Sequence, residues 1–457
     1  MNIFLKKIAP VIAACLSVIP AVAWSDPWRL QDQVANDHLI LKGQSLLRFE
    51  TLTGQYRKGR GDSEDMLILR NRVTAGLRWG NWSVVSEFMD TRQALADETS
   101  PISAGMVNTL EFVQSYVQYR AKDQFFEGDE LAVKVGKQVM DLGGRRLIAS
   151  TRFRGSDNAF AGVRADWHSA AGTDLTGIYF MPVRRRPEDR AALLDNEHEV
   201  DEILDQTRFY GASVASHFLA KALRVEVTAL QLTEKDTPKY ATLDRDITTL
   251  GGRLTYRPEG TSLTLDAEAY YQWGDSSLGL GTGPLLDHQA WYGRVDLGWN
   301  FDGPMAPRLS LMYDYVSGDR DPTDGNNNRF STLYGVQPPD YGWTGIYGAF
   351  VRENLKTPGI RLNLKPHKQL AVQMTWRKMN LAAARDRWVK AGLQDATGTA
   401  GDDLGSQLNA KAVWTVIPGN LRFMAGYSQL FAGGYQQRLT GKQFDTRYAF
   451  IEAIVDF

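Results

Sequence analysis

The sequence has almost no cysteine, since Cys15 is the only one among its 457 residues. A single thiol excludes disulfides within the chain, and it excludes zinc sites built from several cysteines. The six histidines stand apart along the chain and form no metal-binding motif. We therefore predict neither a metal nor a cofactor.

The sequence also lacks an excess of charge of either sign. Lys and Arg together number 52, and Asp and Glu together number 53. This balance excludes a strongly basic nucleic-acid-binding protein. The hydrophobic fraction of 43% is too high for a disordered acidic chain. We therefore expect a folded protein that does not bind nucleic acid.

Long apolar runs are absent after residue 24, where none reaches the roughly 18 residues of a membrane helix. The first 23 residues have the pattern of a signal peptide: Lys6 and Lys7, an apolar stretch over 8–19, then the small residues Ala21 and Ala23. We expect cleavage after Ala23, with lipoprotein processing at Cys15 as the alternative. An exported chain without membrane helices is periplasmic, secreted or an outer-membrane β-barrel.

Two-residue alternation of polar and apolar side chains dominates the rest of the sequence. Over 70–79, for example, Val73 and Leu77 share one face, while Arg70 and Arg72 share the other. The same pattern recurs over 263–273 and 291–301. Sustained alternation indicates β-strands with one apolar and one polar face.

Both a soluble β-sandwich and a membrane barrel would produce this alternation. Soluble strands average about 5–6 residues, whereas membrane-spanning strands need about 9–11. Most segments here are of the longer kind, and aromatic residues stand near their ends, as membrane interfaces favour. These residues are Trp79, Trp82, Tyr116, Tyr119, Trp273, Trp291, Trp299, Tyr313, Tyr315, Trp376 and Trp414.

We predict an all-β fold: a transmembrane antiparallel up-and-down β-barrel of about 18 strands that fills residues 24–457 as one domain. The weak segment 345–354 is assigned to a loop, which keeps the strand number even. We expect strands over 39–53, 66–79, 82–92, 109–120, 131–140, 158–168, 173–183, 206–218, 223–234, 246–257, 262–273, 287–301, 307–317, 357–379 (two strands, broken at Pro366), 405–416, 420–431 and 445–457.

The predicted connections alternate in length. Residues 80–81 and 258–261 form tight turns, whereas 93–108, 184–205, 274–286, 317–344 and 380–404 are long and polar. Short turns at one rim and long loops at the other are typical of outer-membrane barrels. The spaced leucines of 184–205 predict a short helix there.

Three stretches give the sequence a family resemblance. They are 135–138 with 142–148 and 160–164; the stretch 317–325 with Phe330 and 333–335; and Thr440-Gly441 before a final strand that ends in Phe457. In these stretches the chain resembles the alginate export porins of Gram-negative outer membranes. It departs from the family pattern at Lys137, where Arg is frequent, and at Ala161, where Asp is found.

The resemblance implies an 18-stranded barrel in the cell outer membrane, surrounded by lipid, with a basic lumen through which a polyuronate leaves the cell. It also implies a periplasmic partner that delivers the polymer, and it places Arg145, Arg146, Arg152 and Arg154 along the pore. The terminal Phe457 resembles the signal that the outer-membrane assembly machinery reads.

Arginine is the residue best suited to line such a lumen, and it outnumbers lysine by 35 to 17. It stays charged and offers a planar fork to carboxylates. Any single arginine has an alternative role as a brace for lumenal acids such as Glu87 or Asp166, while Glu197, Glu199, Asp201, Glu202 and Asp205 place negative charge in an external loop. The substrate-binding candidates are Arg70, Arg72, Lys137, Arg145, Arg146, Arg152, Arg154, Arg164, Arg294 and Arg377.

A group of acids over 319–324 has two interpretations. Asp319, Asp321 and Asp324 could hold calcium through carboxylate oxygens. Their spacing departs from that of an EF-hand loop, so we favour a turn stabilised by bonds from Asp side chains to the backbone.

The function that we predict is passive export of an anionic polysaccharide. One alternative is uptake of small anions or sugar acids by the same fold. The other is an outer-membrane enzyme, for which no catalytic arrangement can be singled out.

Overall fold

The computed structural model describes residues 27–34, 36–151, 153–219, 221–281, 283–337, 340–443 and 445–457. The predicted signal peptide lies outside these residues. The described helices are α2 (Leu30–Gln33), α3 (Arg190–Leu194) and α4 (Gly434–Thr440). In this part of the chain no helix has the length and hydropathy needed to cross a membrane.

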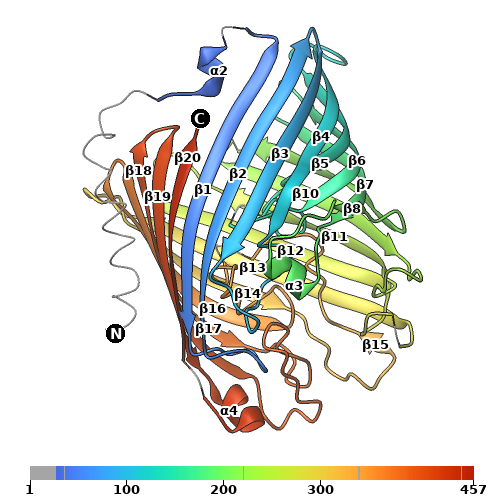
Figure 1. Cartoon of the computed structure of the whole chain (residues 1–457), viewed down its shortest axis with the longest axis vertical. Helices are drawn as coiled ribbons and strands as arrows, with labels where there is room; N and C mark the ends of the chain where they lie inside the picture. Colours follow the sequence, from blue (N-terminus) through green and yellow to red (C-terminus); the bar gives the residue numbers. More distant parts are fainter. Residues whose placement is uncertain are drawn as a thin grey trace.

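The strands dominate the structure (Figure 1). They are β1 (Leu39–Thr53), β2 (Ser63–Trp79), β3 (Trp82–Ala94), β4 (Asn108–Lys122), β5 (Glu130–Val139), β6 (Ala159–His168), β7 (Asp174–Arg184), β8 (Glu202–Ile203), β9 (Thr207–Phe218), β10 (Leu223–Glu234), β11 (Asp246–Tyr256), β12 (Leu263–Ser276), β13 (Leu286–Asn300), β14 (Arg308–Val316), β15 (Asn326–Asn327), β16 (Leu355–His367), β17 (Leu370–Asn380), β18 (Asp403–Ile417), β19 (Leu421–Ala432) and β20 (Thr446–Asp456).

The long strands form a closed antiparallel barrel. Each pairs with the long strand that follows it in the chain, and β20 closes the wall against β1 with Gln44 opposite Asp456 and Thr53 opposite Arg447. Strands β8 and β15 have only 2 residues each, and the other 18 of the 20 described strands build the wall. The predicted strand number and order are thus confirmed, and 345–354 is not a strand.

The two faces of the wall match the predicted alternation. Leu77 and Trp79 are exposed on the outside, whereas Arg70 of the same strand is buried on the lumenal side. The expectation for Tyr116 is wrong, because its ring faces inward, where the ammonium group of Lys134 lies 4.9 Å from the ring centre. An irregular register between β3 and β4 at Glu87 and Phe88 disturbs the alternation just before Tyr116.

Short turns and long loops occupy opposite rims, as predicted. In Figure 1 the C-terminus and α2 lie at the upper rim, while α3 and α4 lie with the long connections toward the other end. The helix α3 falls inside 184–205, where the sequence predicts one. Because outer-membrane barrels turn tightly on the periplasmic side, the rim with short turns is the periplasmic one.

Two long connections fold into the lumen. We call the described residues 140–151 and 153–158, between β5 and β6, the first inner segment, and the described residues 317–337 and 340–354, between β14 and β16, the second inner segment. The first contacts Glu268 on β12 through Arg146, and the second contacts Glu50 on β1 through the Ile346 amide. Both segments therefore reach wall strands far from their own attachment points.

Candidate functional site in the barrel lumen

The first inner segment enters the lumen through a glycine. Gly143 has a φ of +51°, and a Cβ atom there would lie 2.0 Å from a carboxylate oxygen of Glu226 on β10. Only glycine combines this left-handed backbone with so close an approach to the wall. Arg145 and Arg146 follow directly, so the turn positions both guanidinium groups inside the barrel.

The two inner segments bind one another as a short parallel pair. Ile148 and Tyr334 form an isolated bridge, the Ala149 amide donates to the Tyr334 carbonyl at 3.1 Å, and the Tyr334 amide donates to the Leu147 carbonyl at 2.9 Å. Backbone groups buried in the lumen are thereby satisfied. The segments act as one inner body that carries charged side chains from both.

Asp340, on the second inner segment, is the centre of the lumenal charges. Its carboxylate lies 2.5 Å from Arg294 on β13 and 2.9 Å from Arg146 on the first inner segment. Arg352 and Arg361 lie 3.4 Å and 3.8 Å from it. Burial by itself raises the pKa of Asp340, but the guanidinium groups of Arg146, Arg294 and Arg352 outweigh this effect. The pKa of Asp340 is therefore well below its usual value, and this carboxyl is ionised.

The network extends from Asp340 along the wall. Arg377 on β17 lies 2.8 Å from Asp314, and Arg361 on β16 lies 3.2 Å from Asp296. We call Arg146, Arg294, Arg352, Arg361 and Arg377 the arginine cluster. Its carboxylate partners are Asp340, Asp296 and Asp314 together with Glu268, which lies 3.4 Å from Arg146. Guanidinium groups therefore outnumber carboxylates in this buried network.

A second cationic region lies beside the cluster in the lumen. We call it the cationic chamber, a cavity of about 430 Å³ whose wall includes Arg145, Arg154, Lys411 and Arg422. Trp343 and Phe153 supply aromatic surface, and the Lys411 ammonium lies 6.0 Å from the Trp343 ring centre. Within the described residues, Arg154, Lys411 and Arg422 have no carboxylate within ion-pair distance.

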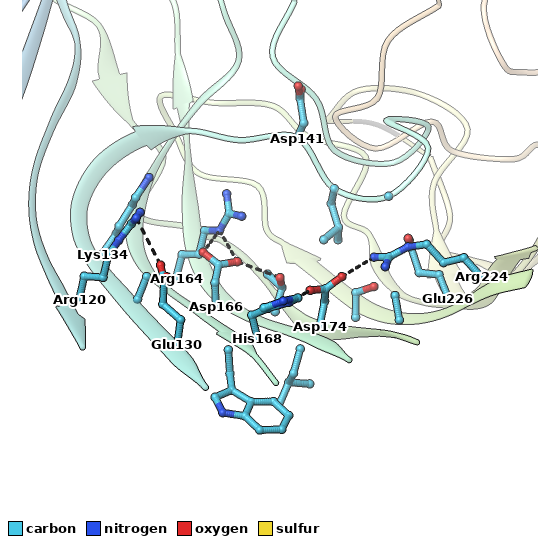
Figure 2. Close-up of a pocket in the computed structure, with 18 residues that line it drawn as sticks. Arg120, Glu130, Lys134, Asp141, Arg164, Asp166, His168, Asp174, Arg224 and Glu226 are labelled. Atoms are coloured by element: carbon cyan, nitrogen blue, oxygen red, sulfur yellow. Dashed lines mark hydrogen bonds and ion pairs between the residues drawn. The ribbon is translucent and has the colours of Figure 1, made fainter. Parts of the chain in front are cut away.

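In a third lumenal pocket, of about 460 Å³, basic side chains are paired with acidic side chains of the same pocket (Figure 2). In it Arg164 lies 2.7 Å from Asp166, Arg224 lies 2.6 Å from Asp174, and Arg120 pairs with Glu130 at 3.3 Å. Figure 2 shows these pairs side by side along the periplasmic ends of the strands. Arg164 thus braces neighbouring side chains.

Two other predicted residues are also paired, in part by acids that loops bring inward. Arg72 lies 2.5 Å from Asp157 of the first inner segment, and Lys137 lies 2.8 Å from Glu111 and 3.7 Å from Asp201. The expectation that Asp201 adds charge only to an external loop is therefore wrong, since its carboxylate is buried against Lys137.

The remaining candidates divide between the regions above. Arg70 donates to the Arg154 carbonyl at 2.8 Å and to Gln44 at 3.0 Å, which places it behind the cationic chamber. Arg145 pairs with Asp141 at 3.1 Å. Arg152 lies outside the described residues. The structure thus brings Arg146, Arg294 and Arg377 together, and separately Arg70, Arg145 and Arg154.

Sequence reasoning did not select Arg352, Arg361, Lys411 and Arg422. Lys411 and Arg422 stand on the polar phases of two predicted neighbouring strands, so pairing those strands could have found them. Arg352 lies in an irregular connection, where no periodicity marks the lumenal side.

The acids over 319–324 adopt turn geometry. Asp321 accepts hydrogen bonds from the Thr323 amide and hydroxyl, and Asp324 accepts one from the Asn326 amide. Among the described residues no cluster of three or more His, Cys, Asp or Glu side chains is arranged to hold a metal ion.

Comparison with known proteins shows the family of this barrel. The family model described as alginate export matches residues 43–450. The chain belongs to the alginate export family. This membership, together with the closed barrel, identifies an outer-membrane channel. No curated protein matches the sequence.

Solved porins share the fold of this alginate export family member at low sequence identity. The outer membrane protein OpdK of Pseudomonas aeruginosa is 13% identical to this chain, with a TM-score of 0.58. The match covers 92% of this chain and 99% of the OpdK chain. A BenF-like porin from Pseudomonas fluorescens Pf-5 is 14% identical with a TM-score of 0.56, covering 91% and 99%. OccK2 of P. aeruginosa, solved in complex with glucuronate, is 14% identical with a TM-score of 0.55, covering 92% and 96%.

Proposed function

We propose that this outer-membrane channel passively exports an anionic polysaccharide, alginate or a related polyuronate, through its cationic lumen. The observation that carries the proposal is the cationic chamber, in which Arg154, Lys411 and Arg422 have no carboxylate within ion-pair distance among the described residues. Glu452 also lines this cavity, but its carboxylate is paired with Arg48 at 3.0 Å. Unpaired cations attract a polyanion and set the selectivity of a pore. Family membership supports the polymer as the substrate.

The position of the chamber fits export. Part of its wall lies near the periplasmic rim, since Arg422 is the second residue of β19 after a periplasmic turn. We also propose a periplasmic protein that delivers the chain to this rim, in keeping with the family.

The aromatic surface beside the cations suits a sugar acid. A pyranose ring has an apolar face that stacks on aromatic rings, and its carboxylate pairs with Arg or Lys. Trp343 and Phe153 lie in the same cavity wall as Arg154 and Lys411. A neutral polysaccharide would use the rings and leave the charges unpaired, so the chamber favours a uronate.

Replacing the unpaired cations tests the proposal. In planar bilayers with a KCl gradient, we expect anion selectivity for the native channel and a shift toward cations for Lys411→Glu with Arg422→Glu. Arg224→Gln is the matched control, because Arg224 is already paired with Asp174. A channel that is cation-selective, or unchanged in the double variant, would reject the role of the chamber.

The substrate needs a separate measurement. Block of the ionic current by oligomannuronate, with no block by a neutral oligosaccharide of equal length, is the expected result. Passage of small acids without interaction with oligomers would instead support uptake of small anions or sugar acids.

A further inference from the structure

Asp340 occupies a binding position that matches the chemistry of the proposed substrate. Its Oδ1 atom contacts Arg294 at 2.5 Å, and its Oδ2 atom contacts Arg146 at 2.9 Å and Arg352 at 3.4 Å. Engaging guanidinium groups through both oxygens is how arginine recognises a free carboxylate. The carboxylate here is supplied by a connection rather than by the barrel wall.

The arginine cluster has more donors than the chain satisfies. The Nε atoms of Arg294, Arg352 and Arg377 and both Nε and Nη2 of Arg361 are buried without a hydrogen-bond partner among the described residues. Unmet donors of buried charged groups are costly, because each has lost its water. Both carboxylate oxygens of Glu268 and Oδ2 of Asp314 also lack a hydrogen-bond partner among the described residues, so the wall carboxylates do not satisfy these donors in the present arrangement.

We propose that the arginine cluster is a carboxylate-binding site for a uronate unit, and that Asp340 is its built-in competitor, which an incoming substrate carboxylate displaces. The proposal deepens the proposed function and rests on it for the polymeric nature of the ligand. Displacement keeps the charge balance, since one carboxylate replaces another. It also moves the second inner segment, because that segment carries Asp340.

A competitor of this kind sets the affinity for the substrate. A site that is held by Asp340 about nine-tenths of the time binds an external carboxylate roughly tenfold more weakly than an empty one. Weak binding suits a conduit, since each unit of a polymer must leave the site as readily as it arrives.

The first experiment compares Asp340→Asn with the native channel. We expect glucuronate to block the current of the variant at about tenfold lower concentration, while Asp340→Glu behaves like the native protein. Asp266→Asn is the control, since Asp266 lines the same pocket but pairs with Arg253 at 2.6 Å. Equal or weaker block in Asp340→Asn would overturn the proposal.

The second experiment uses the native protein, in case Asp340→Asn does not fold. Hydrogen exchange of the amides over 340–350 is measured with glucuronate and with neutral glucose. Displacement predicts faster exchange with glucuronate alone. Slower or unchanged exchange would mean that the acid binds without replacing Asp340, which contradicts the proposal.

The two experiments are independent of polymer export. If oligomannuronate fails to block the native channel, the export proposal fails, while the response of Asp340→Asn to glucuronate still decides whether the cluster binds carboxylates.

Discussion

Arg377 on β17 reaches Asp314 on β14 at 2.8 Å, although β16 stands between the two strands. Gly359 of β16 makes this possible. It is directly opposite Arg377, and a Cβ atom at Gly359 would lie 2.5 Å from Cγ of Arg377. The arginine therefore lies flat over the glycine, with both charged partners fully buried.

Substituting Gly359 tests this arrangement. Gly359→Ala should displace Arg377 and leave Asp314 with weaker compensation, lowering the free energy of unfolding by about 2–4 kcal/mol. Urea unfolding of the refolded barrel in lipid vesicles measures the effect. Gly177→Ala on β7 is the control, since nothing lies within 4 Å of a Cβ there. Equal losses in both variants would show that Arg377 does not depend on the glycine.

Glu50 anchors the second inner segment to the wall. Its carboxylate accepts hydrogen bonds from the Ile346 amide at 3.0 Å and the Tyr448 hydroxyl at 2.9 Å. In Glu50→Gln the charge-assisted bonds weaken by about 1 kcal/mol, which corresponds to roughly fivefold faster hydrogen exchange at Ile346. Glu50 also pairs with Arg48 on β1 at 2.8 Å, and Arg48 keeps Glu452 as a partner at 3.0 Å, so wall strands away from β1 should keep their exchange rates. Acceleration throughout the barrel would instead indicate general destabilisation.

Asp319 makes the external side of the second inner segment sensitive to pH. Burial and the nearby carboxylate of Asp386 raise the pKa of Asp319 to about 6, against the opposing effect of Arg329. Because the folded state favours the protonated acid, this segment gains stability below the unfolded pKa of about 3.9 and loses it as the pH rises through about 6. Hydrogen-exchange protection over 317–330 should therefore fall between pH 4 and 7.

The matched variant separates Asp319 from other titrating groups. Asp319→Asn should keep the protection high across this range, because the amide cannot ionise. If the native protein and the variant respond to pH alike, another group is responsible.

Phe457 closes the seam of the barrel. Its amide donates to the Gly43 carbonyl at 2.8 Å, and its ring lies where a side chain of residue 43 would be. Phe457→Ala should lower the fraction of folded barrel, as seen by the heat-dependent shift in electrophoretic mobility. Val455→Ala removes an exposed apolar side chain of the same strand and should fold like the native chain. Comparable yields of both variants would count against a special role for Phe457.

The sequence predicts the wall well because lipid and lumen impose opposite requirements on alternate residues. The strand from Leu263 to Ser276 shows this: Tyr271 and Trp273 point outward, while Glu268 and Gln272 are buried inside. Even the break near Pro366 falls within two residues of the observed end of β16 at His367. Each of these assignments depends only on neighbours along the strand.

The site is predicted less completely, because the inner body depends on contacts between distant segments. The polar residues of 317–337 do not distinguish a loop in water from one inside the lumen, and the apolar run over 341–351 indicates burial without showing that Asp340 meets the arginine cluster. Without that fold, nothing sets Arg294 apart from the other arginines on the polar faces of the strands. Arg352 lies in an irregular connection, where no alternation predicts which way its side chain faces. Arg164 pairs with Asp166, and Arg72 pairs with Asp157. These ion pairs, which depend on the folded structure, give both arginines a structural role.

Current block by a defined oligomannuronate, added to the periplasmic side of the native channel in a planar bilayer, tests the central claim most directly. We predict an anion-selective channel whose current the oligomer interrupts, more strongly at low salt, where screening of charges is weak. A cation-selective channel that ignores the oligomer at every salt concentration would contradict a cationic conduit for polyuronate.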